Sequence, residues 1–238
     1  MAERKVDVLT VRWYERAARS PDIVTRWLDA AREHLPEAMP RRFGDVEPLR
    51  GRFDRDGGDG FRRGHQQAEG LFFLAGTAPV YSASLSARKA RYFGPTVAHS
   101  LDVALKPDDD RVRRFALALT HPGMVYVSAS VNGQTLDDGR LWGGAPDEQP
   151  FLAPLGEWLG LSPKPPSWCW FGPAYSRLVR RSVNGTQIAG GLLWTGGPWV
   201  TERLQARLSE VDPADRHATR MPGGLRRNPL QMLFSLRR

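Results

Sequence analysis

The length, composition and charge of this 238-residue chain exclude several classes of protein. With 41% hydrophobic residues the chain can bury a core, so a folded protein is expected rather than an intrinsically disordered one. No apolar run approaches the ~20 residues that span a bilayer, and the N-terminal residues lack the apolar segment of a signal peptide. We therefore expect a cytoplasmic protein with no membrane contact and, because Cys169 is its single cysteine, no intramolecular disulfide.

The net charge of +8 is unevenly distributed along the chain. Residues 161–238 carry twelve basic and four acidic groups, so their excess equals the net charge of the whole chain. Only four of the 34 basic residues are lysines, and a GC-rich genome produces such an arginine excess as readily as phosphate recognition does. Charge alone therefore does not identify a nucleic-acid-binding protein.

The N-terminal region is predicted to form a strand and then a helix. Residues 6–14 are rich in β-branched and aromatic side chains, which is typical of a strand. In the helix, Ser20 is the expected N-cap and Pro21 lies in the first turn. Its apolar face consists of the residues that recur at helical spacing, Ile23, Trp27, Ala30, Ala31 and Leu35. Trp13 and Trp27 are interpreted as core residues.

The run Asp54–Gly60 is rich in aspartate and glycine, as calcium-binding loops are. Its spacing does not fit an EF-hand, because the sixth position, which requires glycine, is Asp59 and the twelfth, which requires glutamate, is His65. We expect an exposed turn here.

The middle of the chain is predicted to be mainly β-structure. Strands are expected at residues 71–74, 81–86, 101–105 and 125–131, the second and third of which alternate apolar and polar side chains. Three aspartates before residues 111–119 indicate a helix, because acidic side chains favour the positive end of the helix dipole. Asn132–Gly133 is a signal for a two-residue hairpin.

A weak repeat has an offset of 52 residues. Val131-Asn-Gly and Trp142-Gly-Gly recur as Val183-Asn-Gly and Trp194-Thr-Gly-Gly, and an apparent helix follows each tryptophan unit, at residues 151–159 and 200–208. The repeat indicates either two related hairpin–helix units or two hairpins that use the same turn chemistry.

Trp168, Trp170 and Phe171 place three large aromatic side chains within four residues. Each would bury about 150–250 Å², which is too much apolar surface for a solvated loop. We expect this segment to pack into the core and to be followed by a helix from Pro173 to Val179.

Motifs of known chemistry are missing from the sequence. It contains no phosphate-binding loop, dinucleotide-binding fingerprint, His-Glu-x-x-His or Gly-x-Ser-x-Gly, and its five histidines have no metal-like spacing. The Cys169–Trp170 step occurs in papain-like proteases, but the rest of their signature is missing, so we expect a buried, unreactive cysteine. The sequence therefore predicts no catalytic residue, cofactor or metal site.

The chain resembles the bacterial immunity proteins that neutralise toxins of polymorphic and contact-dependent systems. The resemblance depends on the strand–helix opening, the central antiparallel sheet, the Trp-Gly-Gly turns and the segment from Trp168 to Tyr175. It implies a scaffold that occludes the active site of a toxin, and it implies no catalytic residue.

These observations predict one α+β domain, residues 1–215, with helices packed against a mainly antiparallel sheet. Residues 216–238 form a basic tail that either docks on this domain or waits for a partner. Exposed arginines and aromatic residues are the expected partner-binding groups: Arg88, Arg91, Tyr92, Trp199, Arg226 and Arg227. The first interpretation is a non-enzymatic protein-binding protein. The alternatives are an enzyme whose site the sequence does not reveal and a nucleic-acid-binding module.

Overall fold

The computed structural model describes residues 3–16, 22–87, 96–137, 140–143, 151–153, 157–162 and 164–200. The helices are α1 (Ile23–His34), the short 3-10 helix η2 (Pro36–Ala38), α2 (Phe53–Gln67), α3 (Asp110–Ala118) and α4 (Pro173–Val179). The first strands are β1 (Arg4–Arg16), β2 (Arg42–Gly44), β3 (Gly51–Arg52), β4 (Leu71–Ala75), β5 (Val80–Ser86) and β6 (Thr96–Val103). The later strands are β7 (Met124–Asp137), β8 (Arg140–Trp142), β9 (Phe151–Ala153), β10 (Glu157–Gly160), β11 (Trp168–Phe171), β12 (Thr186–Ile188) and β13 (Gly191–Trp194).

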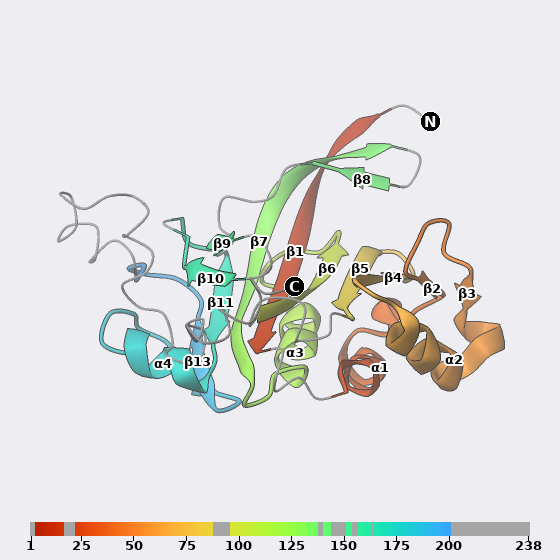
Figure 1. Ribbon diagram of the computed structural model, residues 1–238. Coiled ribbons are helices and arrows are strands. Elements are labelled where there is room, and N and C mark those ends of the chain that lie inside the picture. Colours follow the sequence, from red (N-terminus) through yellow and green to blue (C-terminus); the bar gives the residue numbers. More distant parts are fainter. Residues whose placement is uncertain are drawn as a thin grey trace.

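One sheet of eleven strands organises the described residues, and the predicted α+β class with a mainly antiparallel sheet is confirmed. The strand order is β12-β13-β11-β7-β1-β6-β5-β4-β2-β3, with β8 paired to β7, while β9 and β10 form a separate two-stranded sheet. The longest strands, β1 and β7, lie side by side at the centre (Figure 1).

The ends of β1 and β7 project beyond the rest of the sheet and carry β8 (Figure 1). β1 pairs with β7 from Arg4 onward but with β6 only from Leu9 onward, so the first five residues of β1 extend past the neighbouring strand. We call this projection the arm and define it as Arg4–Val8, Asn132–Asp137 and Arg140–Trp142.

One face of the sheet packs against α1, α2 and α3, and we call it the helix-covered face. Trp13 of β1 contacts Trp27 of α1 and Phe115 of α3, with ring centroids 6.0 and 5.9 Å apart. Trp168 and Trp170 of β11 belong to the same core. The predicted core roles of Trp13, Trp27 and the aromatic segment are confirmed, because all of these side chains are buried.

The opposite face carries a second, aromatic core. Tyr14 of β1 and Tyr126 of β7 pack against Trp158 of β10, with ring centroids 5.5 and 6.0 Å apart. Phe171 of β11 stacks on Tyr175 of α4 at 5.8 Å. Because successive strand residues point to opposite faces, the aromatic segment of β11 contributes to both cores.

The close approach of β7 explains why a glycine, Gly172, follows the aromatic segment. A Cβ atom there would lie 2.0 Å from the carbonyl oxygen of Met124 and 3.0 Å from that of Val125, both backbone atoms of β7. The Gly172 N–H also donates to the Val125 carbonyl at 2.9 Å. We expect Gly172→Ala to lower the free energy of unfolding by about 2–3 kcal/mol in urea denaturation, because β7 must move to admit the methyl group.

Gly133 provides the matched control, since a Cβ atom there meets nothing within 4 Å. Gly133→Ala should change the free energy of unfolding by no more than about 0.5 kcal/mol. Equal stability of the two variants would contradict this account of Gly172.

The exposed turn expected at Asp54–Gly60 is wrong, because these residues belong to α2. Gly57 interrupts the helix with a φ of 62°, a conformation that glycine adopts at little cost. Phe61 is fully buried and contacts Phe43 and Phe72, with ring centroids 5.2 and 5.4 Å apart. The packing of Phe61 therefore keeps this segment helical, although its composition favours a turn.

The hairpin expected at Asn132–Gly133 is also wrong, because β7 continues through both residues to Asp137. They pair with Val8 and Asp7 of β1, which provides a neighbouring strand throughout. The helix expected at residues 151–159 is replaced by β9 and β10. The first of the two predicted hairpin–helix units is therefore not formed, and the predicted helix at residues 200–208 lies, apart from Val200, outside the described residues.

The N-terminus of α1 differs from the prediction by two residues. The helix begins at Ile23, and Asp22 rather than Ser20 is its N-cap, with its carboxylate accepting hydrogen bonds from the backbone N–H groups of Val24 and Thr25 at 3.1 and 3.3 Å. The predicted tail 216–238 lies outside the described residues.

Candidate functional site

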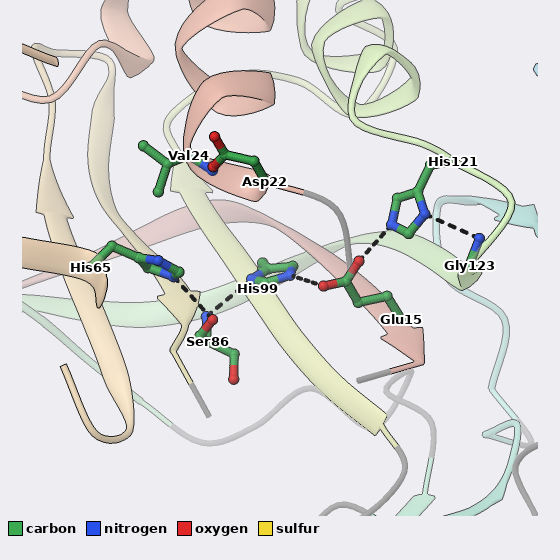
Figure 2. Close-up of polar contacts among 8 residues, drawn as sticks. All are labelled: Glu15, Asp22, Val24, His65, Ser86, His99, His121 and Gly123. Atoms are coloured by element: carbon green, nitrogen blue, oxygen red, sulfur yellow. Dashed lines mark hydrogen bonds and ion pairs between the residues drawn. The ribbon is translucent and has the colours of Figure 1, made fainter. Parts of the chain in front are cut away.

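Three titratable side chains meet inside the protein where β1 and β6 adjoin the turn between α3 and β7 (Figure 2). Glu15 Oε1 lies 3.0 Å from His99 Nε2, and Glu15 Oε2 lies 2.5 Å from His121 Nε2. The side chains of Glu15, His99 and His121 are 0%, 1% and 6% exposed. We call these three residues the Glu15 network.

The other ring nitrogens determine where the imidazole protons lie. His99 Nδ1 accepts a hydrogen bond from the backbone N–H of Ser86 at 3.0 Å, and His121 Nδ1 accepts one from the backbone N–H of Gly123 at 3.0 Å. A backbone N–H can only donate, so each Nδ1 is unprotonated and each neutral ring carries its proton on Nε2. Both Nε2–H groups therefore donate to the Glu15 carboxylate.

Ser86 joins a third histidine to the Glu15 network (Figure 2). The last pair between β5 and β6 is Ser84 with Ser100, so the Ser86 backbone lies beyond the β5–β6 ladder. Its N–H reaches His99, while its carbonyl oxygen lies 3.2 Å from Nε2 of His65, a residue of α2. Burial lowers the pKa of His65. Ser86 pairs with Leu71 of β4 on one side, and on the β6 side the imidazoles of His65 and His99 take the place of a strand partner.

Charged groups of α1 lie close to the Glu15 network. Burial lowers the pKa of Arg26, and the charge of Glu15 raises it. The Arg26 guanidinium donates to the carbonyl oxygens of Ala118 and Thr120 at the end of α3. Asp22, whose carboxylate bonds to Thr25, has a weaker electrostatic effect on His65.

The hydrogen bonds of the Glu15 network restrict its chemistry. A general base needs an imidazole nitrogen that is free to take a proton from a substrate. Both nitrogens of His99 and both nitrogens of His121 already have partners inside the protein. The arrangement is that of a structural network that ties β1, β5, β6 and the α3–β7 turn together. In the described part of the chain, no group of three or more His, Cys, Asp or Glu side chains is arranged to hold a metal ion.

The structure locates only one of the predicted partner-binding residues. Trp199 is 1% exposed and its indole N–H donates to the Ser162 carbonyl at 2.8 Å, so the expectation of an exposed side chain is wrong. It packs on Trp194 and Phe171 because the sheet gives its large ring a place in the aromatic core. The remaining five, Arg88, Arg91, Tyr92, Arg226 and Arg227, lie outside the described residues.

The Glu15 network was not predicted from the sequence, although the sequence contains a local signal for it. Glu15 continues the inward-facing row of Leu9, Val11 and Trp13 in β1, at a spacing of two. His99 continues the inward-facing row of Val103 and Leu101 in β6 and lies opposite Trp13. A titratable residue at an apolar position of a strand indicates a buried polar partner.

Cys169 is buried in the aromatic core, as expected. Burial raises the pKa of its thiol well above the usual range, and a hydrogen bond with Tyr126 only partly offsets this. Since the thiolate is the reactive form, we expect no reaction with a thiol reagent such as DTNB at pH 8 in the native state, and full reaction in denaturant. Modification of the native protein as fast as that of free cysteine would contradict this prediction.

The arm carries the largest exposed apolar side chain of the described residues. Trp142 of β8 is 59% exposed, and Val131, at the base of the arm, is 40% exposed. Trp142 pairs with Thr135, which pairs with Lys5, so these three side chains form a row on one face of the arm. Lys5 Nζ donates to Thr135 Oγ1 at 2.8 Å. Because side chains alternate between the two faces of β1, this row lies on the helix-covered face of the sheet, beyond the part that the helices cover.

Comparison with known proteins gives no family for this chain: no family model, curated protein or solved structure matches it. Within the described residues, no helix has the length and apolar character needed to cross a membrane.

Proposed function

We propose that this chain is a non-enzymatic protein-binding protein that contacts its partner through the arm. The observation that carries the proposal is the exposure of Trp142, 59%, on a projecting three-stranded ribbon. Tryptophan is among the residues that contribute most to protein interfaces, because its ring buries a large apolar area at a small entropic cost.

The surroundings of Trp142 support a binding surface. Thr135 and Lys5 lie beside it in one row, and Gly133 leaves open space between this row and Val131. The surface therefore combines an aromatic ring, a cationic group and an uncovered stretch of strand. The closed hydrogen bonds of the Glu15 network support binding rather than catalysis, since each imidazole nitrogen there is already engaged.

The test is a comparison of three baits in pull-downs from the lysate of the host. The baits are the native chain, Trp142→Thr, and Ile188→Thr as the control, because Ile188 is a 40% exposed strand residue outside the arm. The proposal predicts a protein that the native chain and Ile188→Thr capture and that Trp142→Thr loses. Capture that Trp142→Thr retains in full would contradict it.

The resemblance to immunity proteins suggests the class of the partner, a toxin enzyme whose active site the arm occludes. If the captured partner is such an enzyme, an equimolar amount of the native chain should abolish its activity, and Trp142→Thr should restore it. A captured enzyme that stays fully active in the complex would contradict this part of the proposal.

A further inference from the structure

The Glu15 network contains one proton for each hydrogen bond. Four bonds connect Ser86 N to His99 Nδ1, His99 Nε2 to Glu15, His121 Nε2 to Glu15, and Gly123 N to His121 Nδ1. With Glu15 ionised and both rings neutral, two backbone N–H groups and two Nε2–H groups supply the four protons. Each bond then has one donor and one acceptor.

A further proton on either ring cannot fit this arrangement. In both rings Nε2 is already protonated, so the proton must go to Nδ1. There it points at the backbone N–H of Ser86 or of Gly123, and two donors face each other. The backbone group must move away, although the new imidazolium charge is attracted by Glu15.

We propose that the Glu15 network is a proton-sensitive lock, which opens at Ser86 when His99 takes up a proton and at Gly123 when His121 does. Ser86 is the last residue of β5. Gly123 ends the turn that leads to β7, and its carbonyl accepts the backbone N–H of Arg16 at 3.1 Å. Opening at Ser86 would loosen the end of β5 on its β6 side, and opening at Gly123 would loosen the start of β7.

The neighbouring charged groups allow this local response. His65, on α2, donates to the Ser86 carbonyl, and burial lowers its pKa, so it stays neutral over more of the pH range. Arg26, on α1, is held by carbonyl oxygens at the end of α3 and interacts with Glu15. Asp22 acts weakly on His65 and pairs with Arg62 of α2 at 3.5 Å. Among the described groups, then, the positive charge of Arg26 favours the ionised form of Glu15.

The experiment is a pH titration of the full chain by NMR between pH 8 and pH 5, which brackets the ordinary imidazole pKa of about 6.5. Imidazole nitrogen shifts report the tautomer and charge of His99 and His121, and amide hydrogen exchange gives the protection of Ser86 and Gly123. At pH 8 both rings should be Nε2–H tautomers. As each ring becomes charged, the protection factor of its backbone partner should fall by at least about tenfold.

The strand amides of Val11 and Leu101 serve as the reference and should keep their protection over the same range. Protonation of His34, which lies outside the network, should have no effect on Ser86 or Gly123. The proposal is overturned if either ring becomes charged while its partner amide stays protected, if all strand amides lose protection together, or if neither ring titrates above pH 5.

His121→Gln separates the two halves of the lock. A glutamine amide can still donate to Glu15 but takes up no proton, so the pH dependence of Gly123 should vanish while that of Ser86 remains. Loss of the pH dependence at both sites would contradict the assignment of each imidazole to its own amide. If this variant does not fold, the titration of the native chain decides the question alone.

Discussion

Glu15→Gln is expected to lower the free energy of unfolding by about 3 kcal/mol, a large part of the 5–15 kcal/mol typical of a folded domain. The carboxylate accepts hydrogen bonds from the Nε2–H groups of His99 and His121. A glutamine amide has one acceptor and one donor end, so one imidazole meets a donor. If that ring shifts its proton to Nδ1, the conflict moves to the backbone N–H of Ser86 or Gly123.

Urea denaturation at pH 7.5 measures this effect, with Glu3→Gln as the matched control. Glu3 is exposed, so the same chemical change there should shift the free energy of unfolding by no more than about 0.5 kcal/mol. A loss below that value in Glu15→Gln would show that the buried carboxylate does not hold the two imidazoles as the geometry indicates.

Trp142→Thr is expected to weaken binding of the partner by about 2–4 kcal/mol, which is about 30- to 1,000-fold in Kd. The loss follows from removing the aromatic ring that projects from the arm, the side chain we propose to be central to the interface. Threonine keeps the β-propensity of the position, so the fold should persist. Isothermal titration calorimetry with the captured partner gives the Kd.

Two controls make this result specific to the arm. Ile188→Thr removes an apolar group of another edge strand, β12, and should leave the Kd within about threefold of the native value. The urea midpoint of Trp142→Thr should equal that of the native chain. Native affinity in Trp142→Thr would exclude the arm as the interface.

The predicted elements that the structure confirms have local causes. β1 was predictable from its β-branched and aromatic residues, and α4 from Pro173 after an aromatic segment too apolar for solvent. The signal for each element lies within its own residues. The core positions of Trp13 and Trp27 follow from the same local periodicity.

The elements that sequence reasoning missed depend on distant partners. α2 contains Gly57 but is held by the ring of Phe61 against Phe43 and Phe72. β7 passes through Asn132–Gly133 because β1 lies beside it. Neither partner can be read from local composition.

The candidate site could be predicted only in part, because Glu15 is 84 residues from His99 and 106 from His121. Periodicity in β1 and β6 would have located two of the three residues, since both occupy apolar positions of adjacent strands. His121 lies in a turn, where no periodicity exists. Its place beside Glu15 follows only from the way α3 returns the chain to β7.

The indole rings differ in their exposure to solvent, so the intrinsic tryptophan fluorescence of the native chain can report on binding at the arm. Of the eight tryptophans, seven are at most 3% exposed and Trp142 is 59% exposed. An aqueous collisional quencher such as iodide therefore reaches one fluorophore, which lies on the arm. The fraction of the tryptophan fluorescence that iodide quenches should therefore fall when a protein binds to the arm and rise again when it dissociates. Binding can then be followed in real time without a dye or a fused tag.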